Sequence, residues 1–267
     1  METAGGHDDN MFLAASPDGL GNLNRLGGAY GSVSPAVAAD LAGAGFRVRL
    51  AYLGDFRGAE AAGLLAAQTL ELRGSFPAWG PLRVHLAGYG TAFQANKSPE
   101  DDYRAAGAEL GFRLRFADAV ALSAAVRGEI RWLTADDFGV SDQDRMLLPV
   151  LRLPWQATPW LEVAAVGSGV FISSANETTA GDFRRWRGGI DATVSVGNAS
   201  FTTSGWAGTI SVADRRETHL GGLAEATLAL GNNLALFARG EWSGPVSSGA
   251  TPYYARRVGL LGLTARV

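Results

Sequence analysis

Charged residues in this chain recur at every second position, and that spacing limits the chemistry they can do. Arg127, Glu129 and Arg131 alternate with apolar or small residues, and Arg113 and Arg115 do so one segment earlier. Successive side chains of a β-strand point to opposite faces, so this period puts the charges on one face. Such a face can bind ions or pair with the next strand. It needs water or partners, because an unpaired charge in a dry space is costly.

Groups suited to catalysis or metal binding are sparse. The chain has no cysteine and only three histidines, at His7, His85 and His219. Neither His85 nor His219 has a serine at a spacing that suits a nucleophile and its base. No His or Cys cluster indicates a metal site, and the acidic run at 100–102, which could bind Ca²⁺, is more typical of a solvated loop. We expect no enzyme activity, no catalytic residue, no metal and no cofactor.

The overall composition narrows the class of protein further. The chain has 267 residues and a formal net charge of −3, so nothing indicates a nucleic-acid partner. It has no apolar run of about 18 residues, the length a transmembrane helix requires. The start, from Met1 to Gly6, lacks the basic-then-apolar pattern of a signal peptide. We therefore take Met1 as an added start on a mature sequence.

Alternation continues along nearly the whole chain and predicts antiparallel strands. A soluble β-sandwich also alternates, with its apolar face inside. Here, however, the strands are about 10 residues long, as a tilted membrane strand must be. Charge lies at mid-strand on one face, as in the strand around Glu129, while the other face stays apolar through almost every strand. These features favour a transmembrane up-and-down antiparallel β-barrel.

Tight turns and longer polar connections alternate, as they do in such barrels. Residues 117–119, 197–199 and 231–233 are typical of three-residue hairpin loops. Their register puts Glu109 opposite Arg127 and Glu225 opposite Arg239, matching acid with base. The longer connections are 96–102, 135–145, 174–184 and 244–252.

The turns divide the chain into a flexible N-terminal segment, 1–9, and a barrel of about 14 strands over 10–267. If the short first strand does not form, 12 strands become the alternative, with 25–34 reassigned. Pro149 and Pro154 predict a bulge in their strand, because proline cannot complete a ladder. The expected strands are 10–16, 25–34, 44–55, 62–76, 82–95, 103–116, 120–134, 146–155, 159–172, 184–196, 200–213, 218–230, 234–244 and 252–267.

Tryptophans give an independent indication of two interfaces, because aromatic residues gather at both edges of a membrane. One group lies by the predicted short turns and the other near the opposite strand ends, while Trp206 falls nearer mid-strand. The first group is Trp79, Trp155 and Trp160, and the second is Trp132, Trp186 and Trp242.

With these features the chain resembles the bacterial outer-membrane β-barrel superfamily, and small monomeric porins in particular. The resemblance covers about residues 10–267, is architectural, and rests on no motif. It implies a place in the outer membrane of a Gram-negative envelope, contact with outer-membrane lipids and lipopolysaccharide, and other envelope proteins as candidate partners. One feature departs from the pattern: such barrels usually end in an aromatic residue, whereas this sequence ends in Val267. Either residues are missing from this end or the host accepts a branched aliphatic residue.

The charged face would line the lumen, and arginines outnumber acids on it. The residues we expect to line the pore are Arg47, Arg49, Glu71, Arg73, Glu109, Arg113, Arg115, Arg127, Glu129, Arg131, Arg187, Asp191, Glu225, Arg239 and Glu241. The same alternation turns Arg83, Arg152, Arg185, Arg256, Arg266, Asp55 and Glu162 inward. The outer loops would be acidic, at Glu60, Glu100, Asp101, Asp102, Asp136, Asp137, Asp142 and Asp144.

A barrel of this size is too wide for side chains alone to fill. The sequence therefore predicts an aqueous pore for passive diffusion of ions or small polar solutes, with a mild preference for anions. A second interpretation is that the charges form Arg–Glu ladders that only brace the wall, and both can hold together. An alternative function is a structural or anchoring barrel in an envelope-spanning complex for motility or polysaccharide export. A membrane enzyme is disfavoured by the scarcity of histidines.

Overall fold

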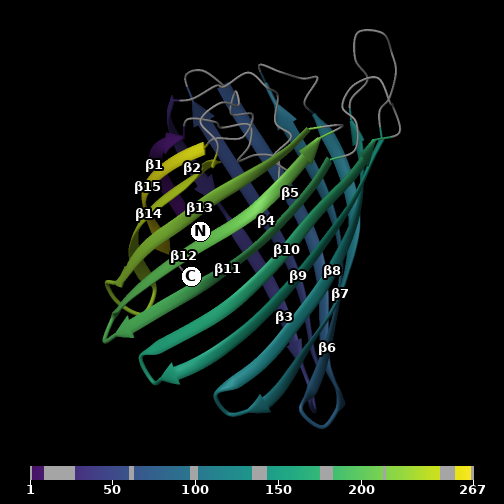
Figure 1. Ribbon diagram of the computed structural model, residues 1–267, viewed down its shortest axis with the longest axis vertical. Coiled ribbons are helices and arrows are strands. Elements are labelled where there is room, and N and C mark those ends of the chain that lie inside the picture. The colour runs from purple at the N-terminus through teal and green to yellow at the C-terminus, as the bar shows by residue number, and fades with distance from the viewer. Residues whose placement is uncertain are drawn as a thin grey trace.

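The computed structural model describes residues 2–8, 28–59, 63–96, 102–133, 143–174, 183–212, 215–246 and 256–265, and folds them into one antiparallel sheet (Figure 1). Its strands are β1 Glu2–Asp8, β2 Gly28–Ser34, β3 Ala36–Ala42, β4 Arg47–Ala59, β5 Gly63–Trp79, β6 Leu82–Ala95, β7 Tyr103–Ala117 and β8 Val120–Leu133. They continue with β9 Gln143–Thr158, β10 Leu161–Ser174, β11 Phe183–Val196, β12 Ala199–Val212, β13 Arg215–Ala229, β14 Leu234–Pro245 and β15 Arg256–Ala265. Among these residues no helix is long and apolar enough to cross a bilayer.

β2 and β3 are two halves of one strand, interrupted only at Pro35. Both pair with β4, and the register is unbroken, because Val33 lies opposite Phe56 and Ala36 opposite Leu53. Pro35 has no N–H to donate, yet its carbonyl still accepts a hydrogen bond from the Gly54 N–H at 2.8 Å. Counting β2 and β3 as one strand gives 14 strands, as the sequence predicts.

β1 closes the barrel, because it pairs with β15 on one side and with β2 on the other. Closure satisfies the backbone groups that an open edge would expose, which a lipid environment demands. β3 continues past the first residue of β1 and, in the described part of the chain, pairs with β4 alone. The segment 1–9 that we expected to be flexible thus contains a strand, while the strand expected at 10–16 lies outside the described residues.

Six short connections lie at one end of the barrel, at the bottom of Figure 1. We call this the short-turn end and the opposite one the loop end. The short connections are 43–46, 80–81, 118–119, 159–160, 197–198 and 230–233. Two of the predicted three-residue loops are tighter than expected, with turn residues 118–119 and 197–198. Beside the first of these turns, at the end of β7, the register shifts between Arg115 and Ala117.

The predicted acid–base register is confirmed on both hairpins, with Glu109 opposite Arg127 and Glu225 opposite Arg239. The bulge expected near Pro149 and Pro154 is displaced, because β9 and β10 keep one register through both prolines. The register shifts only where Glu162 pairs with Gln156, next to the turn. The β9–β10 pairing skips Leu148 and Pro149 and resumes in the same register, and Pro154 is paired with Ala164, so neither proline shifts the strand.

Outward side chains away from the loop end are mainly apolar. Leu70, Leu110, Ile190 and Leu261 are each more than half exposed, from strands all around the barrel. A charged or polar lumen with an apolar exterior is the arrangement that a lipid-facing barrel requires. The six tryptophans assigned to two girdles are all exposed on this surface, and the list is Trp79, Trp132, Trp155, Trp160, Trp186 and Trp242.

Glycines opposite large inward side chains let those side chains lie flat on the wall. A methyl group added at Gly107 would collide with the ring of Tyr89, and one added at Gly221 would collide with the ring of Trp206. Each glycine is the direct cross-strand partner of its ring. An aromatic side chain thus covers a stretch of backbone that has no side chain of its own, a device that stabilises sheets.

Candidate functional site

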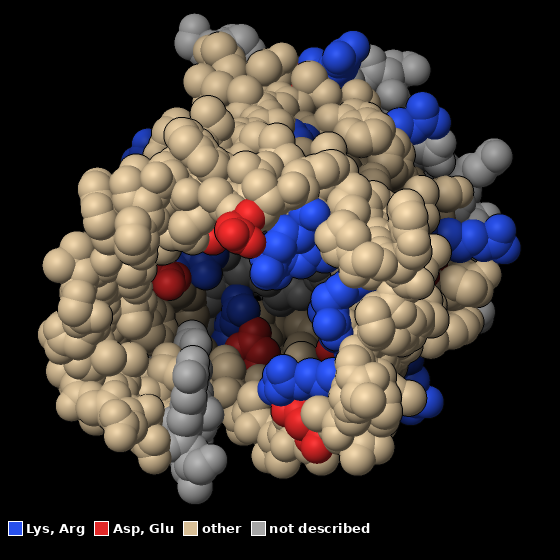
Figure 2. Space-filling model, turned by 90° about the horizontal axis from the view of Figure 1, so that it is seen from below, with Lys and Arg blue, Asp and Glu red and all other residues tan. Residues whose placement is uncertain are grey.

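Every described residue that the sequence assigned to the lumen lies at an inward position of its strand. Figure 2, seen from the short-turn end, shows a hollow with basic and acidic side chains on its wall. The strand registers place on this face Arg47, Arg49, Glu71, Arg73, Glu109, Arg113, Arg115, Arg127, Glu129, Arg131, Arg187, Asp191, Glu225, Arg239 and Glu241. Arg83, Arg152, Arg185, Arg256, Asp55 and Glu162 share it, and Arg266 lies outside the described residues. Asp144, expected in an acidic loop, lies within β9 instead.

Glu129 is the centre of a buried network near the middle of β8. Tyr89 donates its hydroxyl proton to Glu129 at 2.7 Å, and Arg131 donates from Nε to the other carboxylate oxygen at 2.7 Å. Arg127 lies 3.7 Å from Glu129 and stacks over the Tyr89 ring at 3.6 Å. Glu129 and Arg131 are almost fully buried, so each depends on nearby groups of opposite charge in place of water, and the network braces the wall.

The predicted Glu109–Arg127 contact is not made, although the two residues lie opposite each other. Arg127 turns to Tyr89 and Glu129, and Glu109 is reached by Arg73, at 3.4 Å, and by His85, at 3.5 Å. Arg73 comes from two strands away and passes over Ala87, the small residue that lies between it and Glu109 in the register. The predicted Glu225–Arg239 pair is confirmed at 3.9 Å.

Ion pairs on the other side of the lumen have the reverse arrangement, with one arginine between two acids. Arg152 lies 3.0 Å from Glu162 and 3.6 Å from Asp191. Arg239 lies 3.4 Å from Glu241 in addition to its contact with Glu225. All of these side chains are partly exposed to the lumen, so water screens them and each pair contributes little to stability.

Four inward arginines differ, because no carboxylate of the described residues lies within 4 Å of them, although Arg49 has Asp40 as its cross-strand neighbour on β3. They lie on β4, β6 and β7 near the short-turn end, and they are Arg49, Arg83, Arg113 and Arg115. All four are exposed. The excess of positive charge in the lumen is therefore concentrated on one side of one mouth.

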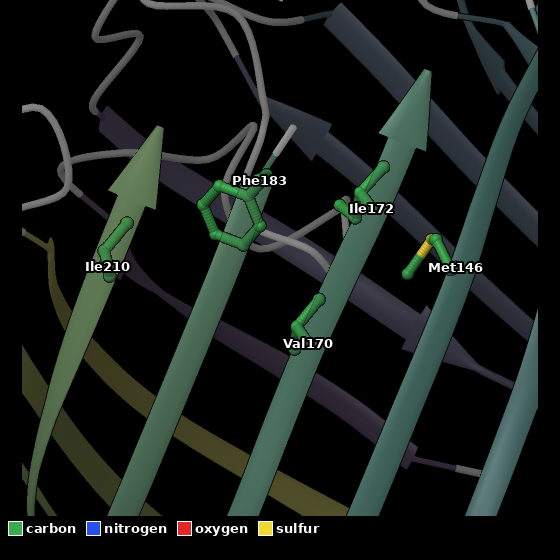
Figure 3. Packing of buried hydrophobic residues seen from close by; sticks show 5 residues of the cluster. All are labelled: Met146, Val170, Ile172, Phe183 and Ile210. Atoms are coloured by element: carbon green, nitrogen blue, oxygen red, sulfur yellow. The ribbon is translucent and has the colours of Figure 1, made fainter. Parts of the chain in front are cut away.

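The loop end of the lumen is lined differently, by apolar side chains that are buried. One cluster joins Tyr30, Leu65, Phe93 and Ala95, with Tyr103 and Leu260 packed against it. The second cluster comes from the four adjacent strands β9 to β12 (Figure 3) and comprises Met146, Val170, Ile172, Phe183 and Ile210. Sequence reasoning missed both clusters because it sought polar residues on the inward face. Alternation along the strand would have placed their residues on the inward face, since Phe183 shares the face of Arg185 and Arg187, but it would not have shown that they pack together.

Trp206 and His219 are two further inward residues whose roles the sequence did not reveal. Trp206 lies under the guanidinium of Arg187, 4.2 Å from ring centre to Cζ, which explains why it belongs to neither girdle. His219 is fully buried, and its Nε2 lies 3.1 Å from Glu217. Within the described ranges, no group of three His, Asp or Glu side chains could hold a metal ion.

Comparison with known proteins gives likeness in structure alone. No protein-family model matches the sequence, and no curated protein matches it. The "CymD monoaromatic hydrocarbon channel" is similar with a TM-score of 0.55 at 9% identity, over 100% of this chain and 88% of that one. The "Anion-selective porin from Comamonas acidovorans" is similar with a TM-score of 0.52 at 9% identity, over 99% of this chain and 96% of that one. The chain thus has the fold of the bacterial outer-membrane β-barrel porins and channels.

Proposed function

We propose that the protein lies in a bacterial outer membrane and forms an aqueous pore for passive diffusion of ions or small polar solutes. The observation that carries this proposal is the contrast between the two faces of the wall. Charged residues such as Arg113, Arg152 and Arg239 hold inward positions. Basic and acidic side chains line the hollow of Figure 2, while the large exposed side chains of the outward positions are mainly apolar. Exposed charges in the lumen require water there, and apolar side chains outside require lipid.

The unpaired arginines support a mild preference for anions. A basic wall raises the local concentration of anions and lowers that of cations. Many of the other inward arginines are paired with acids. The net positive field therefore comes mainly from the β4–β7 side of the short-turn mouth. The similar porin and channel support a transport role through shared fold only.

Single-channel recording of the refolded chain in a planar lipid bilayer tests the proposal. We expect steady, step-like openings. In a salt gradient we expect a reversal potential whose sign shows that anions permeate more readily than cations. Openings with cation preference would contradict the anion preference alone, and silence from a folded barrel would contradict the pore. No catalysis is expected, and a change of His219→Ala should leave the conductance steps intact.

One observation favours a second candidate, a structural barrel that anchors an envelope-spanning complex. The apolar side chains of the two loop-end clusters are buried, as they would be in a lumen closed at that end. A silent barrel that co-purifies with a specific envelope protein from native membranes would support this candidate over the pore.

A further inference from the structure

We propose that Arg83, Arg113 and Arg115 form a binding site for the carboxylate or phosphate group of a small solute. The site lies in the lumen at the short-turn mouth. The inference rests on the proposed function, since it names the chemistry of a solute that would enter the pore, but the site can be tested without measuring a current.

The register brings the three arginines together on two adjacent strands. Arg83 of β6 lies directly opposite Arg113 of β7, and Arg115 is the next inward residue along β7. Directly opposed residues have Cβ atoms about 4.5–5.5 Å apart, and like charges in that position are destabilising. A wall that only needed bracing would place an acid here, as it does opposite Arg239.

No acid of the described chain relieves this repulsion. The nearest acid along β7 toward the turn is Asp118, which is exposed and makes no ion pair with any of the three. Glu109, two inward positions farther along β7, is already engaged by Arg73 and His85. The missing negative charge is therefore one that a solute can supply.

Arg83 is held in place for this role. Its Nη2 donates to the carbonyl of Gly45 at 3.1 Å, in the turn between β3 and β4. To reach that turn it passes its cross-strand neighbour on β5, Pro77, whose short ring leaves the way open. One anchored donor leaves other guanidinium N–H groups available, and these match the paired oxygens of a carboxylate or phosphate.

The position selects a dissolved anion over a lipid headgroup. All three arginines have inward parity, whereas their neighbours Leu114 and Phe116 point out toward lipid. Arg104 lies on the same strand with outward parity and is exposed, which makes it a matched control.

The test is equilibrium dialysis of the refolded full chain, in detergent, against radiolabelled inorganic phosphate. Saturable binding is expected for the parent chain and for Arg104→Gln. The triple variant Arg83→Gln, Arg113→Gln, Arg115→Gln should bind at least 10-fold more weakly, and the triple lysine variant, which keeps the charge, should fall between. Folding of each variant is checked by its heat-modifiable mobility on gels. If the triple variant does not fold, Arg83→Gln alone should weaken binding at least 3-fold.

The site is overturned if the parent shows no saturable binding. It is also overturned if the glutamine variants of the site bind phosphate as tightly as Arg104→Gln does. Conductance distinguishes this failure from failure of the pore. A parent that conducts but does not bind phosphate loses the site and keeps the pore. A parent that binds phosphate but never conducts keeps the site and loses the pore.

Discussion

Glu129 makes two short interactions, with Tyr89 and Arg131 at 2.7 Å each, and makes them where little solvent reaches. Its side chain is 6% exposed and that of Arg131 is 3% exposed. A change of Glu129→Gln keeps the shape but removes the negative charge beside the buried guanidinium of Arg131. We expect the free energy of unfolding to fall by about 3 kcal/mol. Urea titration of the barrel in lipid vesicles, followed by tryptophan fluorescence, measures it.

Glu225 is the matched control for this prediction. It also pairs with an arginine, in this case Arg239 of the facing strand β14, but at 3.9 Å and with 35% of its side chain exposed. Glu225→Gln should cost less than about 1 kcal/mol, because water screens the pair. Equal losses for the two variants would mean that the surroundings of Glu129 are wet.

Trp206 lies over Gly221, and the three atoms nearest to the place of the missing side chain all belong to its ring. Gly221→Ala should destabilise the barrel by about 1–3 kcal/mol through overpacking. In a chain that also carries Trp206→Ala, the same change should cost almost nothing. Gly240→Ala, where a methyl group meets open space, is the control. Additive losses in the double variant would refute the contact.

Two glycines lie in short turns between strands, and only one of them has a backbone conformation that favours glycine. Gly197 has a φ of +58°, a left-handed conformation that costs other residues about 1–2 kcal/mol. Gly197→Ala should therefore lower stability by about 1 kcal/mol. Gly231 lies in an equivalent short turn without a positive φ, and Gly231→Ala should be close to neutral. Chemical denaturation of both variants checks the difference, and a larger loss at Gly231 would contradict it.

Strands that carry full alternation could be predicted from the sequence to within a few residues. The segment 82–95 was predicted with the bounds of β6, and β8 ends one residue before its prediction. β1 could not be predicted, because Glu2–Asp8 has no apolar face and is a strand only because β15 and β2 pair with it. β3 was missed because Pro35 signals a break, whereas the ladder continues through its carbonyl.

For the whole molecule, the alternation of side chains along each strand predicts which residues face the lumen, but not which of them contact one another. Which acid an arginine reaches depends on the size of side chains between them, such as Ala87 under Arg73. The buried loop-end clusters and the unpaired arginines at the other mouth depend in turn on how all strands assemble. Period two contains no information about that assembly, since a strand's alternation is the same whichever neighbours it acquires.

The apolar exterior makes a prediction that only a membrane-embedded barrel satisfies. Leu110 and Phe116 both point outward from β7, 59% and 61% exposed, the first near mid-strand and the second near the short-turn end. Leu110→Arg should cost about 2–4 kcal/mol of folding stability in vesicles, because the charge falls at the bilayer centre. Phe116→Arg should cost about 0–1 kcal/mol, because the charge reaches the interface. On a barrel surrounded by water both changes would be harmless, so equal small effects would place the wall outside the membrane.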